Sequence, residues 1–146
     1  MVDKIHQYCL LVATKMQLER LLEETLERRA ELMSARYAIG GAGDGMPHVR
    51  AGHPDSKVVA GIEKLDLNER ECDELIKLYE ETIAKIEKLQ LEIERAIEAL
   101  PLDEAAVTRA RYLEGMTVDA ICRKFPYSRS TVYRLLTHAR ELLGDM

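Results

Sequence analysis

Apolar residues recur along most of the chain at intervals of three or four, which is the spacing of one face of an α-helix. The repeat is most regular after residue 56, where ten of twelve successive core positions are apolar. The ten are Ile62, Leu65, Cys72, Ile76, Tyr79, Ile83, Ile86, Ile93, Ile97 and Leu100, interrupted by Glu69 and Gln90. Alternating spacings of three and four are typical of coiled coils. The pattern therefore predicts a long helix over residues 56–99 whose apolar stripe needs a partner.

The N-terminal stretch predicts another long helix, from Asp3 to Tyr37. Its expected apolar stripe contains Ile5, Tyr8, Cys9, Val12, Met16, Leu22, Leu26 and Met33. No alternating run of β-branched residues suggests a strand, so the fold class is expected to be all-α. The two long helices fit an antiparallel hairpin within one chain, a coiled coil with a second copy, or both.

The segment between these helices, residues 38–55, is rich in glycine and also contains Pro47 and Pro54. We interpret it as a connector that lets the helices turn back on each other. A phosphate-binding loop is disfavoured because no strand precedes the glycines and no Gly-Lys-Ser/Thr follows them. His48 and His53 are candidate metal ligands, but a loop offers little support for them. No metal or cofactor is therefore expected.

Pro101 is expected to end the second helix, because a residue before proline is pushed out of the helical region. The Leu100–Pro101 step then separates two parts of the chain. Residues 1–99 are predicted to form a long helical hairpin or coiled coil. Residues 100–146 are predicted to form a separate helical bundle.

The second part carries the pattern of two short helices that cross at a tight turn. Thr117 and Ser128 are each placed to cap a helix N-terminus, Pro126 interrupts the chain between the helices, and Gly144 stops the second helix. The expected buried positions are Val118, Ile121, Cys122 and Phe125 in the first helix, and Val132, Leu135, Leu136, Ala139 and Leu143 in the second. This arrangement is a helix-turn-helix bundle.

The opposite face of the second short helix is hydroxyl-rich and basic. From Arg109 to Arg140 there are seven Lys or Arg residues against two acids, in a chain whose net charge is −5. Such a face fits the major groove of double-stranded DNA, with Arg123 and Lys124 on the phosphate backbone. The predicted DNA-binding residues are Arg123, Lys124, Ser128, Arg129, Ser130, Thr131, Tyr133, Arg134, Thr137 and His138.

Four short motifs carry a family resemblance. They are Leu100–Pro101, the run Arg111–Tyr112–Leu113–Glu114–Gly115–Met116–Thr117, Ile121–Cys122 and the run Ser128–Arg129–Ser130–Thr131–Val132. Together they resemble region 4 of bacterial sigma factors. The whole chain, with its long helices and glycine-rich segment, resembles phage late-transcription regulators of the RinA/ArpU type.

This resemblance implies promoter recognition in which the second short helix reads bases. Two positions depart from the family pattern. Cys122 stands where a small alanine is usual, and Pro126 stands where a turn glycine is usual. Proline cannot adopt the positive φ that glycine supplies, so the angle between the two helices is open at this point.

The remaining features exclude several classes of function. Neighbouring acidic residues diverge around a helix and His6 is expected on a helix surface, so no catalytic constellation forms and no enzyme is predicted. Three widely spaced cysteines, Cys9, Cys72 and Cys122, are expected as buried thiols in a reducing compartment. The longest apolar run, Tyr8–Ala13, is too short for a membrane span or a signal segment. The expected location is the cytoplasm of a bacterial host cell.

Two hypotheses follow from these observations. The first is a sequence-specific transcription regulator, phage or prophage encoded, that forms a homodimer through its long helices and has RNA polymerase as a candidate second partner. The alternative is an oligomeric DNA-packaging or assembly protein, similar to a small terminase subunit. A ring of eight or more copies would favour packaging, whereas a monomer or dimer would favour regulation.

Overall fold

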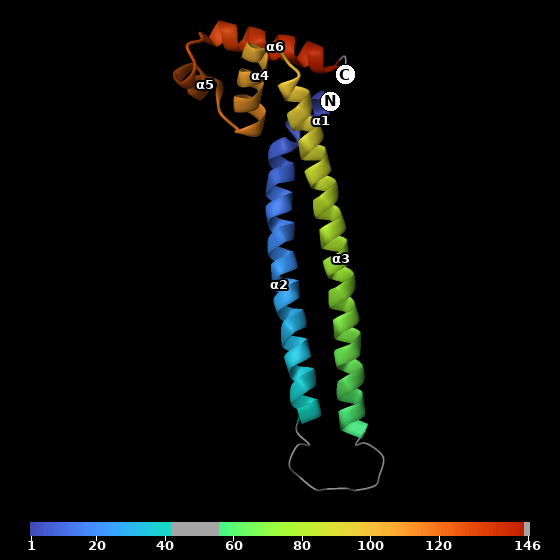
Figure 1. The fold of residues 1–146 in the computed structure, drawn as a ribbon. Helices are drawn as coiled ribbons and strands as arrows, with labels where there is room; N and C mark the ends of the chain where they lie inside the picture. The colour runs from blue at the N-terminus through green and yellow to red at the C-terminus, as the bar shows by residue number, and fades with distance from the viewer. Residues whose placement is uncertain (42–55, 145–146) are drawn as a thin grey trace. The chain divides into compact units, whose positions relative to one another are not determined.

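The computed structural model describes residues 1–41 and 56–144, and all regular elements in those two ranges are helical (Figure 1). In chain order they are α1 (Val2–His6), α2 (Tyr8–Gly41), α3 (Ser56–Glu98), α4 (Leu102–Thr108), a π-helical turn η1 (Arg109–Leu113), α5 (Val118–Lys124) and α6 (Arg129–Gly144). The all-α prediction is confirmed. None of the described helices combines the length and the apolar composition needed to cross a membrane.

The chain forms two compact units. One contains Met1–Gln17 and Ile83–Met146, and the other contains Leu18–Thr82. The break expected at Leu100–Pro101 is present, because α3 ends at Glu98 and α4 begins at Leu102. The compact units divide the chain at other points, inside α2 and α3, so each is described separately below.

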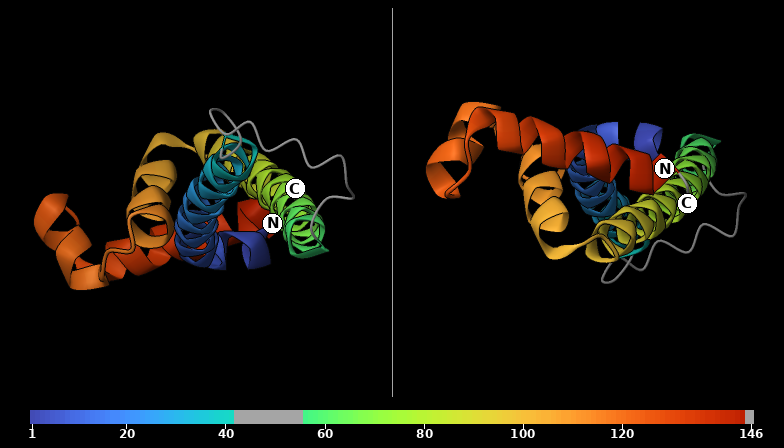
Figure 2. Two further views of the ribbon diagram at one scale, coloured as in Figure 1. Left: turned by 90° about the horizontal axis from the view of Figure 1, so that it is seen from below. Right: turned by 90° about the horizontal axis from the view of Figure 1, so that it is seen from above.

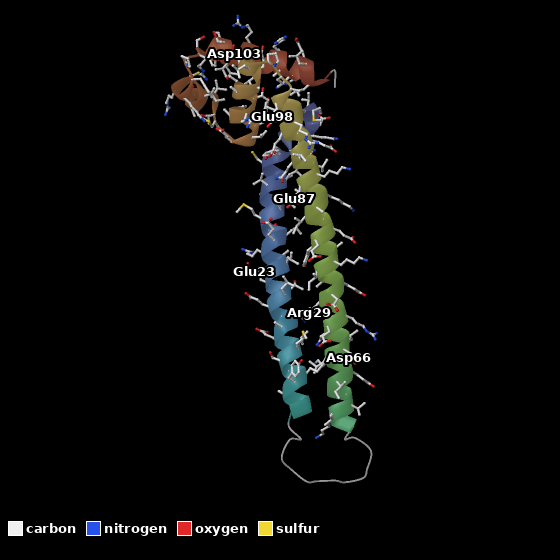
Figure 3. The ribbon with its side chains drawn as sticks, in the orientation of Figure 1. Glu23, Arg29, Asp66, Glu87, Glu98 and Asp103 are labelled. Carbon is white, nitrogen blue, oxygen red and sulfur yellow. The ribbon has the colours of Figure 1, made fainter. Side chains whose placement is uncertain are left out.

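In the unit formed by Leu18–Thr82, α2 packs antiparallel to α3 and charged side chains cross the seam between them. Arg29 Nε lies 2.5 Å from Asp73 Oδ1, and Arg36 pairs with both Asp66 and Glu69 (Figure 3). Glu69, one of the two polar interruptions of the α3 repeat, is therefore the partner of an arginine on α2. The intrachain hairpin is the arrangement that this unit adopts.

The predicted apolar stripe of α2 is only partly correct in this unit, because Leu22 is half-buried but the other two members are exposed. Leu26 and Met33 are 47% and 42% exposed, whereas Arg29 and Arg36 occupy the seam. An arginine can line a helix interface with its aliphatic stem while its guanidinium reaches a carboxylate, and apolar spacing alone does not reveal this. On α3, Cys72 is buried as expected, but Ile62 is 40% exposed.

In the other unit, a first core joins three stretches that are far apart in the sequence. Ile5 and Tyr8 pack against Ile93 and Ile97 of α3. The same core contains Ala96, Leu100, Ala139 and Leu143. The C-terminal half of α6 is thus held by the N-terminus of the chain as well as by α3 (Figure 2).

A second core lies between α4, η1, α5 and α6. It consists of Val107, Ala110, Ile121, Val132, Leu135 and Leu136. Each large aliphatic side chain buried in this way contributes roughly 1.5–3 kcal/mol relative to exposure. The apolar positions expected on the first short helix and on the N-terminal half of the second therefore pack in this core, whereas Ala139 and Leu143 belong to the first core.

Three details of the expected N-terminal helix are corrected. The helix is interrupted at Gln7, whose N–H bonds to Lys4 O three residues back, so α1 and α2 are separate. Cys9, which was expected to be buried, is exposed because it lies beside the core face of the helix and not on it. Its thiol donates a hydrogen bond to Tyr112 O at 3.2 Å. Met16 is 65% exposed, while the neighbouring Lys15 pairs with Glu87.

The segment expected to be a connector overlaps the end of a helix. Residues 38–41 belong to α2, which continues to Gly41. The rest of the segment, residues 42–55, lies outside the described residues, and so do the candidate ligands His48 and His53.

We predict that Ile5→Ala lowers the free energy of unfolding by about 2–5 kcal/mol, because it opens a cavity in the first core. Leu10→Ala is the matched control, since Leu10 is 67% exposed and should change stability by no more than about 0.5 kcal/mol. Urea denaturation followed by circular dichroism measures both. Equal effects of the two variants would contradict the role of the N-terminus in this core.

We also predict a loss of stability at alkaline pH that depends on Tyr8. Burial, together with the hydrogen bond that its hydroxyl donates to Glu94 Oε1 (2.6 Å), raises the pKa of Tyr8 from 10.0 to about 12. Folding thus favours the protonated phenol, so its stabilising effect is complete below pH 10 and is lost as the pH rises through about 12. The difference in unfolding free energy between wild type and Tyr8→Phe should shrink over that range in urea titrations. A constant difference would refute the assignment.

Candidate nucleic-acid interface

Two capped helices, α5 and α6, form the candidate interface. Thr117 Oγ1 accepts the N–H of Ala120 at 3.2 Å, and Ser128 Oγ accepts the N–H of Thr131 at 3.3 Å. Both capping predictions are confirmed. A capped N-terminus leaves its remaining N–H groups and the positive end of the helix dipole available to an anion.

The turn between α5 and α6 does not need a glycine. Phe125 is extended (φ −114°, ψ 152°), and the N–H of Tyr127 donates to Phe125 O at 2.8 Å. No described residue of this turn has a positive φ, so Pro126 is compatible with it. The left-handed conformation occurs at Gly115 instead (φ 68°), between η1 and α5.

The exposed face of α6 is the one expected from the sequence. Val132, Leu135, Leu136, Ala139 and Leu143 are buried. Arg129, Ser130, Tyr133, Arg134, Thr137 and His138 are exposed on the other side. Two hydroxyl groups already make local bonds: Thr131 Oγ1 lies 2.9 Å from Ser128 Oγ, and Thr137 Oγ1 donates to Tyr133 O at 2.8 Å. The face is open and polar.

The first turn of α4, where Figure 3 labels Asp103, contacts the turn before α6 and α6 itself. The hydroxyl of Tyr127, in that turn, donates to Asp103 Oδ1 at 2.7 Å, and this hydrogen bond raises the pKa of Tyr127 above its usual value. His138 Nδ1 lies 2.8 Å from Glu104 Oε1. Between these two contacts an open groove is lined by the acids Asp103, Glu104 and Glu141 and by Tyr133, Arg134, Leu135, Thr137 and His138.

The cations of the interface fall into two groups. Lys124 Nζ lies 3.2 Å from Glu114 Oε2, and Arg129 Nε lies 3.6 Å from Asp119 Oδ1. A hydrogen bond with Tyr133 and the charge of Asp119 raise the pKa of Arg129 above its usual value. Arg123 and Arg134 are exposed, and neither forms an ion pair with any residue in the described ranges.

All ten predicted DNA-binding residues thus lie on α5, on α6 or in the turn between them. Three of these ten residues pair with carboxylates that the sequence did not reveal. The carboxylates are Glu104, Glu114 and Asp119. Only Asp119 and Glu114 are near their partners in the chain, so no simple spacing rule identifies the set. Among the described residues, no three His, Cys, Asp or Glu side chains are grouped to hold a metal ion.

Comparison with known proteins identifies the same module. Residues 90–143 match the family model described as "Sigma-70, region 4". The match begins inside α3 and covers α4, η1, α5 and nearly all of α6. No curated protein and no solved structure matches the chain. The match supports a DNA-binding helix-turn-helix of the sigma region 4 type.

We predict that Gly115→Ala destabilises the module by about 1–2 kcal/mol. A Cβ at this position would have room, with Cys9 Sγ 3.8 Å away, but φ of 68° disfavours any residue with a side chain. Thermal unfolding measures the change. Gly61→Ala in α3 is the control, because a Cβ there meets nothing within 4 Å and alanine favours the helix. A stable Gly115→Ala variant would argue against the left-handed turn.

Proposed function

We propose that this protein is a sequence-specific DNA-binding transcription regulator that acts at promoters and has no catalytic activity of its own. The observation that carries the proposal is the exposed polar face of α6, which lies opposite a fully buried stripe within a module that matches sigma region 4. The resemblance of the whole chain to phage late-transcription regulators supports a phage or prophage origin.

The geometry of α6 suits the major groove. The helix has 16 residues and a length of about 24 Å, and its N-terminal half carries Arg129, Ser130, Tyr133 and Arg134. A groove about 12 Å wide admits one helix, and an arginine there can donate two hydrogen bonds to guanine. Arg134 is the strongest candidate for base reading, because it is exposed and no described carboxylate pairs with it.

Backbone contacts belong to the residues around α6. Arg123 and Lys124 end α5, and Ser128 caps α6 beside them. Each phosphate that these groups neutralise should add about −0.9 to the slope of log affinity against log salt concentration. With a net charge of −5, the protein gains little from nonspecific attraction to DNA.

A partner would supply the remaining affinity, and two are proposed. Homodimerisation through the long helices is supported by apolar side chains that remain exposed on them, including Leu26, Met33 and Tyr37 of α2. Contact with RNA polymerase is supported by the sigma region 4 match. A dimer would select a palindromic site from random duplexes, whereas a module acting beside polymerase would select a single half-site.

Two substitutions test the assignment of roles. Arg134→Ala should cost about 1–3 kcal/mol at the selected site and relax the preference at one base pair, because a base contact is lost. Lys124→Ala should weaken binding to selected and random duplexes equally and flatten the salt dependence, because a phosphate contact is lost. Fluorescence anisotropy at several salt concentrations measures both.

Arg28→Ala, on α2 in the other compact unit, is the control for the change of charge and should leave DNA binding unchanged. Equal losses on selected and random DNA for Arg134→Ala would remove it from the base-reading set. Failure of the wild type to retain any duplex at low salt would disprove the proposed function.

A further inference from the structure

Two cations and one histidine on the proposed DNA-binding face are already paired with carboxylates of the same module. The pairs are Lys124 with Glu114 (3.2 Å), Arg129 with Asp119 (3.6 Å) and His138 with Glu104 (2.8 Å). In each pair the carboxylate oxygen uses a nitrogen of its partner that could otherwise bind a phosphate oxygen of DNA. A DNA contact by any of these three side chains must therefore displace or share a partner.

Two of the three pairs, Lys124 with Glu114 and Arg129 with Asp119, contribute little to the stability of the fold. The side chains of Lys124 and Glu114 are 50% and 43% exposed, and those of Arg129 and Asp119 are more exposed still. Ion pairs this open to water contribute little to stability. Their negative charges nevertheless lie within one Debye length, about 8 Å, of any phosphate that approaches the paired cations.

We propose that Glu114 and Asp119 restrain DNA binding by acting as intramolecular competitors of phosphate. The restraint applies to any duplex, whatever its sequence, because phosphates are the same at every site. It leaves Arg134, which no described carboxylate pairs with, to add affinity only where it finds the right base. The two carboxylates thus lower the affinity for every duplex, and the base contact of Arg134 is left to distinguish one site from another. This inference rests on the proposed function.

The third pair differs from the other two in its burial. The Glu104 side chain is only 13% exposed, and it lies in the groove with Asp103 and Glu141. Leaving a largely buried carboxylate without its hydrogen-bond partner is costly, so His138 stays with Glu104. His138 therefore marks the edge of the footprint on α6, whereas Lys124 and Arg129 exchange their carboxylates for phosphate.

The decisive experiment is a double-mutant cycle on binding to a random-sequence duplex. Glu114→Gln should tighten binding about three- to tenfold, because a charge near a phosphate is removed while a hydrogen-bonding side chain of the same size remains. The gain should disappear in the Lys124→Gln background, since no competition then remains to be relieved. Asp119→Asn with and without Arg129→Gln forms a second, independent cycle.

Glu80→Gln in α3 is the matched control, because it changes the net charge equally but lies in the other compact unit. Thermal unfolding of each variant verifies that the fold is intact. The gain should be equal at the selected site and on random DNA, because Lys124 contacts phosphate, which is the same at every site.

Two results would overturn the inference while leaving the proposed function in place. One is a wild type that binds duplex while Glu114→Gln and Asp119→Asn bind no tighter than Glu80→Gln. The other is a gain that persists in the Lys124→Gln and Arg129→Gln backgrounds, which would show that the carboxylates do not act through these cations. Absence of duplex binding by wild type and all variants would instead refute the proposed function itself.

Discussion

The burial of the N-terminal helix against α3 and α6 is the interaction on which the rest of the helix-turn-helix unit depends. Ile5 and Tyr8 meet Ile93 and Ile97, and the C-terminal half of α6 packs into the same core. The N-terminal half of α6 is held separately by the second core, and the turn before it is tied to α4 through Tyr127 and Asp103. One helix is therefore fixed along its whole length on one side, and its other side remains open. A rigid, exposed helix of this kind can be inserted into a groove without first being ordered.

The charge pattern of the same unit explains how an acidic protein can carry a basic reading surface. Two of the four Lys and Arg residues of the surface, Lys124 and Arg129, have a paired carboxylate, so the local positive charge is smaller than the sequence suggests. A DNA-binding protein with weak attraction to phosphate is bound less to nonspecific DNA, although its affinity for its specific site is also lower. In the function that we propose, contacts with bases, with a second copy or with polymerase determine the site at which the protein stays bound.

Much of this architecture follows from local sequence signals. The caps at Thr117 and Ser128 and the buried stripe from Val132 to Leu143 depend on residues three or four positions apart, so the sequence reveals them directly. The seam of α2 was missed because Arg29 and Arg36 face α3, where apolar side chains were expected. The partners of Tyr127 and His138 were missed because Asp103 and Glu104 lie 24 and 34 residues away and are brought close only by tertiary packing.

The composition of the first core also has a consequence for how the protein is made. Residue 5 emerges from the ribosome long before residue 143, and at roughly 5–20 residues per second the delay is about 7–28 s. During that interval Ile5 and Tyr8 have no access to their partners on α6, and the apolar surface that α6 covers in the folded unit stays exposed. This part of the nascent chain is thus open to chaperones, or to the same segment on a neighbouring chain of a polysome, until α6 has been translated.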